Sequence, residues 1–326
     1  MKTTSVMIQS LCVPCHNHCR YCLLSWNGVV EGAPWSRAIH TAERYLNELR
    51  DQGIKCSFSF GYSMEHHDLR NALRTLRRLG SPTAHFLQCD GMRMRNEEEC
   101  HALMEMLVEE GVEQLSFTVY GLKEYHDRFA GRAKDFELLL RMMKASRIPF
   151  TTRIPLTREN ITQIDDLVDL LYHTGCKCIS LFIPHEEGRG RTLEGIRLRR
   201  SDLSLLSQES RMLLNDKIYR TESEWIKNPL QESQRMILVS LRLDNIDELE
   251  RRNALSVVQD IEYLDDLYYK SFPSFIELGK RYGDHCSDTL YRYRDLHQHY
   301  IMLWAREHDI HVYDVTDERY SGSRRF

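Results

Sequence analysis

Short hydrophobic runs alternate with amphipathic helical patterns through the first 185 residues of this 326-residue chain. The runs lie roughly 30 residues apart, which leaves room for a helical crossover between successive parallel strands. The predicted strands are residues 4–11, 55–61, 83–89, 112–121, 148–156 and 176–184. The predicted helices between them are residues 36–52, 69–80, 96–111, 133–147 and 160–175. The pattern therefore predicts an α/β fold with a parallel sheet, either open or curved into a barrel.

The alternation ends after the sixth run. Residues 185–202 are charged and contain glycines, which predicts a loop or hinge. Only helical patterns follow from residue 202 to 309, and residues 310–315 form one further predicted strand. We therefore expect an N-terminal domain of residues 1–190 and a mainly helical C-terminal region of residues 191–326.

The composition argues against several classes of partner. The net charge is −4 and the pI about 6.4, so no strong attraction to nucleic acid or to an anionic membrane is expected. No apolar run approaches the roughly 20 residues that a membrane-spanning helix needs, and the N-terminus does not have the pattern of a secretory signal peptide. These features predict a cytoplasmic protein. In that reducing compartment, close spacing among the ten cysteines indicates metal binding and not disulfides.

Cys15, Cys19 and Cys22 have the spacing C-x3-C-x2-C directly after the first predicted strand. Loops in this place gather at the carboxyl end of a parallel sheet, where active sites lie. Three thiolates on one loop can hold three irons of a 4Fe–4S cluster and leave the fourth iron open for a ligand. The ring of Tyr21 would then lie beside the open iron.

The same loop could instead form a zinc site that adds Cys12 to the three cysteines. Three residues between its two C-x2-C pairs are few for a closed tetrahedron, and His16 and His18 would have no role in it. On this alternative the chain would be a zinc-bearing binding protein. On the cluster interpretation, Cys12 is a packed strand residue.

The loop "CHNHCRYC" (15–22) resembles the C-x3-C-x-aromatic-C motif of the radical S-adenosylmethionine (SAM) enzymes without a mismatch. Three later segments are similar to the peptide-maturase branch of that family: "VYGLKEYHDRFAG" (119–131), "IPLTRENITQIDDLVDLL" (154–171) and "IPHEEGRG" (183–190). Many members of that branch carry a cysteine-rich C-terminal extension, the SPASM domain. Here only Cys286 lies beyond Cys178, which implies a single cluster.

The resemblance implies a partial (β/α)6 barrel similar to a TIM barrel, with one 4Fe–4S cluster on Cys15, Cys19 and Cys22. SAM would bind the open iron through its amino and carboxylate groups. An electron from a donor such as flavodoxin or ferredoxin would cleave SAM to methionine and a 5′-deoxyadenosyl radical, which would take a hydrogen atom from a substrate C–H bond. The substrate would be a peptide. A small molecule is the alternative, because a first strand that begins by about residue 4 leaves no room before it for a peptide-recognition module.

The family's SAM-binding positions are matched unevenly. Family members usually carry Gly-Gly-Glu after the second strand. Here Gly61 is kept, Tyr62 stands where the acid is expected, and Glu65 lies three residues further on. The resemblance implies that Arg153 pairs with the SAM carboxylate, the alternative being a salt bridge within the barrel.

The fourth strand carries Ser116, Thr118 and Tyr120 on one face, as a ribose-binding set would require. The resemblance places Ile183 near the adenine. Asn160 is either a SAM contact or the cap of the helix that follows it.

Five more residues have weaker assignments. Cys89 and Asp90, at the end of the third strand, are candidates for a hydrogen or proton donor. His66, His67 and His185 are expected to be ordinary surface histidines.

Overall fold

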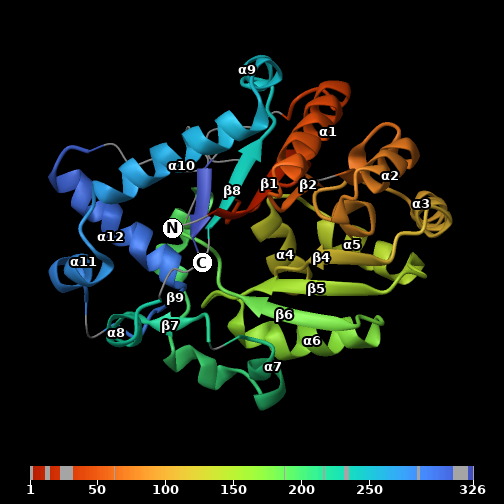
Figure 1. Cartoon of the computed structure of the whole chain (residues 1–326). Helices are drawn as coiled ribbons and strands as arrows, with labels where there is room; N and C mark the ends of the chain where they lie inside the picture. Colours follow the sequence, from red (N-terminus) through yellow and green to blue (C-terminus); the bar gives the residue numbers. More distant parts are fainter. Residues whose placement is uncertain are drawn as a thin grey trace.

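Parallel strands dominate the N-terminal half, as the alternation predicts. The structure is a computed structural model that describes residues 3–11, 15–22, 32–61, 63–186, 188–215, 217–230, 235–284, 287–310 and 322–325. Two four-stranded sheets have the orders β10-β8-β1-β2 and β3-β4-β5-β6 (Figure 1). Their strands are β1 (Thr3–Leu11), β2 (Cys56–Gly61), β3 (Phe86–Gln88), β4 (Gln114–Thr118), β5 (Phe150–Pro155), β6 (Cys178–Phe182), β8 (Arg235–Ser240) and β10 (Gly322–Arg325).

All pairs of neighbouring strands in these two sheets are parallel except β10 with β8. Strands β1 to β6 and the helices between them form the expected α/β partial barrel, which divides into two sheets between β2 and β3. The carboxyl ends of these strands position the site described below.

The expectation of helices alone between residues 202 and 309 is wrong. Strand β8 lies within that range and pairs in parallel with β1, while β7 (Arg220–Thr221) and β9 (Leu290–Tyr291) pair antiparallel. The β8 sequence "RMILVS" is a short apolar run, which periodicity alone cannot distinguish from a buried helical turn. The run forms a strand because β1 offers an edge with unpaired backbone groups, with which β8 pairs. Ile310 is not in a strand, and the rest of the predicted strand 310–315 lies outside the described residues.

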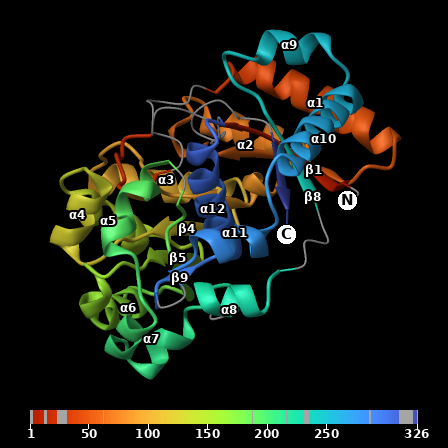
Figure 2. The same cartoon turned by 90° about the vertical axis from the view of Figure 1, so that its left-hand side faces the viewer.

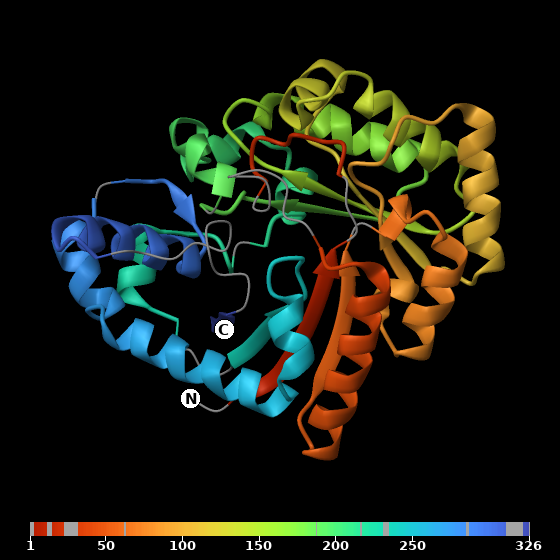
Figure 3. The same ribbon diagram turned by 90° about the horizontal axis from the view of Figure 1, so that it is seen from above.

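Helices cover the outer faces of both sheets (Figure 3). Those of the first half are α1 (Trp35–Asp51), α2 (Leu69–Arg78), α3 (Glu97–Glu109), α4 (Lys123–Ala130), α5 (Asp135–Ala145) and α6 (Ile164–His173). Helix α3 begins with a capping box of Asn96 and Glu99. Helix α4 lies in a stretch for which the sequence predicts no helix.

The C-terminal region is mainly helical. Its helices are α7 (Gln208–Met212), α8 (Glu222–Lys227), α9 (Ile246–Arg251), α10 (Ala254–Lys270), α11 (Phe275–Tyr282) and α12 (Tyr293–Glu307). Helix α10 packs with α1 against the outer face of the first sheet, whereas α8, α11 and α12 share a small core of their own (Figure 2). In the part of the chain that the structure describes, no helix combines the length and apolar character required to cross a bilayer.

The two faces of the second sheet differ in character. Leu115 and Phe117 of β4 are fully buried in the core beneath the outer helices. Ser116 and Thr118 alternate with them and therefore face the inside of the partial barrel. The same alternation continues in β5, where Arg153 pairs in register with Thr118. The inner face is thus polar, and it leads up to the loops at the carboxyl end.

Candidate active site

The cysteine loop, residues 15–22, crosses the carboxyl end of the second sheet. Four backbone hydrogen bonds fix it: His16 N to Gly91 O (2.9 Å), His18 N to Ala130 O (2.7 Å), Arg20 N to Phe129 O (3.0 Å) and Arg189 N to Cys22 O (3.1 Å). Gly91 has φ of 64°, and a Cβ atom at this residue would stand 2.2 Å from Cys15 Sγ. Only glycine therefore fits beside that sulfur. The segments after β3, at the end of α4 and in the 3₁₀ stretch Gly188–Ile196 together hold the loop.

Cys15, Cys19 and Cys22 are free thiols on this loop. Burial is the largest cause that raises the pKa of Cys15 and of Cys19, and the nearby Cys22 raises both further by charge repulsion. The thiolate forms of Cys15 and Cys19 are therefore unfavourable here without a compensating positive charge. Bound metal supplies such a charge and makes thiolates the stable form.

Cys19 is the most enclosed of the three cysteines and packs with Tyr120, Tyr125 and Phe129. The Tyr120 hydroxyl lies 2.9 Å from Cys19 Sγ. Burial raises the pKa of Tyr120 well above its usual value, so the phenol keeps its proton. The hydroxyl expected in a ribose-binding set with Ser116 and Thr118 therefore points to the cysteine loop.

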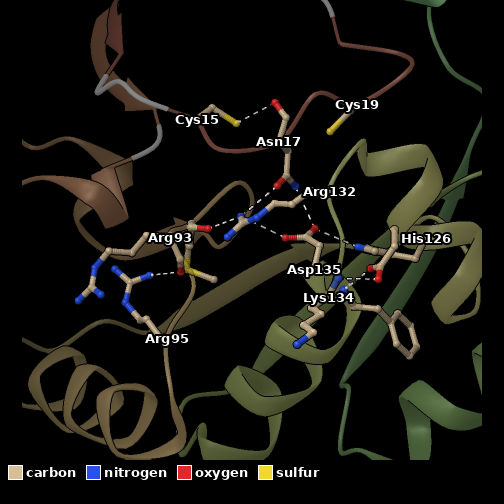
Figure 4. A network of polar contacts seen from close by, with 12 residues as sticks. Cys15, Asn17, Cys19, Arg93, Arg95, His126, Arg132, Lys134 and Asp135 are labelled. Atoms are coloured by element: carbon tan, nitrogen blue, oxygen red, sulfur yellow. Dashed lines mark hydrogen bonds and ion pairs between the residues drawn. The ribbon is translucent and has the colours of Figure 1, made fainter.

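A buried carboxylate joins this loop to the end of β4 (Figure 4). Asp135 accepts hydrogen bonds from Asn17 Nδ2 (3.0 Å) and His126 Nε2 (3.0 Å), and Arg132 Nη1 lies 3.3 Å away. His126 Nδ1 accepts from the backbone N–H of Tyr120 (3.1 Å), so Nε2 carries the proton donated to Asp135. Asp135 thus holds Asn17, which lies between Cys15 and Cys19 in the loop. Through His126 it also holds Tyr120, whose hydroxyl contacts Cys19. The sequence analysis missed this network.

Asp90 belongs to the inner face of the second sheet. Its Oδ1 accepts from Thr118 N (2.7 Å), and its Oδ2 accepts from Thr118 Oγ1 (2.8 Å) and Gln88 Nε2 (2.6 Å). Burial raises the pKa of Asp90. Its neighbour Cys89 faces the other way, fully buried in the core with Leu87. The structure thus separates the two donor candidates, with only Asp90 on the inner face.

Arg153 is exposed on the inner face, and its guanidinium carbon lies 5.1 Å from the centre of the Phe182 ring. Among the described residues, no carboxylate forms an ion pair with it. The salt bridge expected as the alternative to a SAM contact is therefore not formed within this part of the chain.

In the segment after β2, the acid Glu65 is engaged by arginines of the protein. Gly61 ends β2, and Tyr62 lies outside the described residues. Glu65 forms an ion pair with Arg95 (2.8 Å), and its Oε1 also accepts from Arg93 N (3.0 Å). Both side chains of the ion pair are nearly buried, so Glu65 braces the segment after β3.

Tyr21 lies among three aromatic rings, and Ile183 lies in an apolar core. The Tyr21 ring centre is 5.7 Å from that of Tyr120 and 6.0 Å from those of Phe129 and Phe182. Ile183 is 2% exposed and belongs to the core of the second sheet.

Two expectations need correction or refinement. Asn160 does not cap the following helix, because its Oδ1 accepts from Thr157 N (2.8 Å) and not from a backbone N–H of that helix. Its Nδ2 donates to Tyr120 O (2.7 Å) and Pro155 O (2.8 Å). It therefore ties the ends of β4 and β5 together. His67 is exposed as expected, but His66 is half-buried, with its ring centre 4.7 Å from that of Trp35.

The expectation of an ordinary surface histidine is wrong for His185. Its Nε2 accepts from Arg292 Nη1 (2.9 Å) and its Nδ1 donates to Asp295 Oδ1 (2.9 Å), so it joins the loop after β6 to α12. Next to it, Glu186 is paired with Arg197 Nε (2.9 Å). Burial raises the pKa of Glu186 to about 7. This second network lies at the end of the segment that bonds to the cysteine loop through Arg189.

Comparison with known families supports the cluster interpretation of the cysteine loop. A family model described as the Radical SAM superfamily matches residues 11–171, which include all three cysteines of the loop and the network below it. The chain belongs to the radical SAM superfamily. Its members are enzymes that use a 4Fe–4S cluster and SAM, so the enzyme class and cofactors expected from the sequence are confirmed.

Several solved structures are similar to this radical SAM chain at low identity. Streptococcus suis SuiB bound to S-adenosylmethionine has a TM-score of 0.44 at 15% identity, with 73% of this chain and 50% of that chain covered. Escherichia coli coproporphyrinogen III oxidase (HemN) has a TM-score of 0.43 at 13% identity, covering 74% and 63%. Native anSMEcpe with bound AdoMet has a TM-score of 0.46 at 15% identity, covering 93% and 97%. The chain thus spans half of SuiB.

The donor set fits a radical SAM cluster. No three His, Cys, Asp or Glu side chains in the described ranges converge closely enough for one metal ion. In a cubane each thiolate binds a different iron, so its three ligands stand further apart than those of a single ion. The thiols of Cys15, Cys19 and Cys22 share one fixed loop and repel each other as thiolates, and glycine leaves space beside Cys15. The zinc alternative also needs Cys12, which lies outside the described residues.

Proposed function

We propose that this enzyme cleaves SAM reductively at one 4Fe–4S cluster held by Cys15, Cys19 and Cys22, and uses the 5′-deoxyadenosyl radical to take a hydrogen atom from a substrate C–H bond. The observation that carries the proposal is the triple-cysteine loop, fixed by three segments over a polar inner sheet face. When bound, the cluster supplies the electron and an iron position open to SAM.

The chain's own residues would orient SAM. Arg153 would pair with the carboxylate of SAM, since none of the described acids pairs with it. Ser116 and Thr118 would meet the ribose from the same face, and the Gly61 backbone would lie near the methionine end. Tyr21 would shield the site from water with its ring.

Two further positions complete the proposed site. Ile183 would support the adenine from the core side. Asp90 is the better candidate for exchanging a proton with the substrate, at Oδ1, which accepts a single hydrogen bond from the described residues. Cys89 would need to leave the core to take part.

The reaction can be tested without knowing the substrate. Anaerobically reconstituted protein should contain about four irons per chain, as one cubane requires. With dithionite and SAM it should release 5′-deoxyadenosine, measured by mass spectrometry, whereas a C15A/C19A/C22A variant should not. Cys12→Ala should keep its iron. Colourless protein that contains zinc, and that loses it on Cys12→Ala, would establish the zinc alternative.

We further propose a peptide as the substrate and a reduced flavodoxin or ferredoxin as the electron donor. The similarity of residues 119–131, 154–171 and 183–190 to peptide maturases supports the first part. Co-expression with a short peptide encoded beside the gene should change the mass of that peptide, and the triple-cysteine variant should leave it unmodified. If the only product of complete reactions is a modified metabolite, the small-molecule alternative replaces the peptide.

A further inference from the structure

A tyrosine hydroxyl forms a hydrogen bond with the sulfur of one of the proposed cluster ligands. The Tyr120 hydroxyl lies 2.9 Å from Cys19 Sγ, and either atom could donate while Cys19 is a thiol. Once the sulfur binds iron it has no proton, so only the hydroxyl can donate.

We propose that Tyr120 is a tuning residue that donates an O–H···S hydrogen bond to the Cys19 thiolate and raises the reduction potential of the cluster. The inference rests on the proposed cluster ligands and adds a residue to which the sequence analysis gave another role. Reduction adds negative charge to the cluster, part of which falls on its sulfurs. A donor aimed at a sulfur therefore stabilises the reduced form more than the oxidised form.

The surroundings of Tyr120 make this contact well defined. Its side chain is 2% exposed, and its ring is stacked on that of His126 with centres 4.8 Å apart. Water therefore has little access with which to replace the hydroxyl as donor. In a site of low polarity, one such hydrogen bond acts more strongly than it would in water.

The buried network fixes both ends of the contact. His126 Nδ1 accepts the backbone N–H of Tyr120, while Asp135 holds His126 and, through Asn17, the loop that carries Cys19. The Asp135 carboxylate therefore holds both the donor, Tyr120, and the loop that carries the acceptor, Cys19. A tyrosine that only filled space would need no such alignment.

Tyr120→Phe removes the hydroxyl and keeps the ring. We expect unchanged iron content after reconstitution and a lower midpoint potential in an electron paramagnetic resonance titration without SAM. A roughly tenfold shift in the oxidised-to-reduced equilibrium corresponds to about 59 mV for one electron.

Tyr125→Phe is the matched control. Tyr125 lies in the same small core, but its hydroxyl bonds to Thr157 Oγ1 (2.9 Å) and not to a cysteine. The midpoint potential of the cluster in Tyr125→Phe should equal that of the wild type. If the midpoint potential of Tyr120→Phe does not differ from those of the wild type and Tyr125→Phe beyond their measured scatter, the proposal is overturned.

If Tyr120→Phe does not hold a cluster, the wild type still decides. Resonance Raman spectra recorded in H₂O and D₂O should show a shift of the Fe–S(Cys) stretching bands, and the absence of any shift would reject the hydrogen bond. These measurements need no SAM. Failure of SAM cleavage with an intact Tyr120 effect would therefore contradict the proposed reaction alone.

Discussion

Two histidine–aspartate pairs of similar geometry serve different parts of this molecule. His126 and Asp135 lie nine positions apart in the sequence, 3.0 Å apart in space, and both are almost completely buried. His185 and Asp295 lie 110 positions apart, 2.9 Å apart in space, and 27% of the His185 side chain remains exposed. The first pair lies within the range matched by the family model, whereas the second joins that range's downstream loop to α12.

The first pair holds the cysteine loop in place, whereas the second pair attaches the C-terminal region. In both pairs one imidazole nitrogen accepts a hydrogen bond and the other donates one, so the ring links two groups. His126 links the Tyr120 backbone to Asp135, and His185 links Arg292 to Asp295. Only Asp135 also binds a residue of the cysteine loop. Loss of the first pair should therefore affect the cluster, while loss of the second should affect stability with the cluster kept.

The largest effect should follow Asp135→Asn. The NH₂ group of the new asparagine must face either Arg132 or the two donors Asn17 and His126, and a donor cannot accept their hydrogen bonds. Arg132 also loses its negatively charged partner. We expect a loss of about 3–5 kcal/mol in the free energy of unfolding of the apoprotein, measured with urea. Reconstituted iron should fall as well. Asp166→Asn, at an exposed position in the first turn of α6, should lower the unfolding free energy by less than about 1 kcal/mol and leave the iron content unchanged. Full iron content in Asp135→Asn would break the comparison.

A smaller effect is predicted for Glu186→Gln, beside the second pair. Burial raises the pKa of Glu186 to about 7, so the folded protein binds a proton there that the unfolded chain releases above its ordinary pKa of about 4.5. Stability should therefore fall as pH rises from about 4.5 to 7, by about 3 kcal/mol from this group. Unfolding free energies measured across this range should fall in the wild type relative to Glu186→Gln. Parallel pH profiles would show that Glu186 stays charged.

Asp295→Asn should cost about 1–3 kcal/mol, because it weakens one charge-assisted hydrogen bond to a partly exposed histidine. Burial alone would raise the pKa of Asp295, but the bond from His185 and nearby positive charges lower it overall. Its contribution should be present above the unfolded pKa of about 4 and lost as pH falls below it. Iron content should remain that of the wild type. If Asp295→Asn keeps the wild-type free energy of unfolding but no longer binds iron, the second pair also serves the cluster.

The sequence predicted the parts of the fold that depend on local pattern. The strands β1 to β6 and the cysteine loop follow from periodicity and spacing. Strand β8 could not be predicted, because its partner β1 lies more than 200 residues earlier in the chain. The site divides in the same way. Cys15, Cys19 and Cys22 are recognisable from spacing, whereas Asp135 and Asp295 become important only when folding brings Asn17 and His185 to them.

Arg153 sharpens the comparison because it belongs to neither network. Arg132 and Arg292 are engaged by protein groups at the two pairs, but Arg153 faces the inner surface with an aromatic ring and none of the described carboxylates beside it. If SAM provides the missing anion, Arg153→Ala should weaken SAM binding about tenfold, since a charged pair that remains partly hydrated contributes roughly 1.5 kcal/mol. Calorimetry of the reconstituted protein measures this, with iron content as the check on the cluster. Arg158→Ala is a suitable control, because that exposed arginine already has Asp202 at 3.4 Å. Equal dissociation constants for both variants would assign Arg153 to the inner surface and not to SAM.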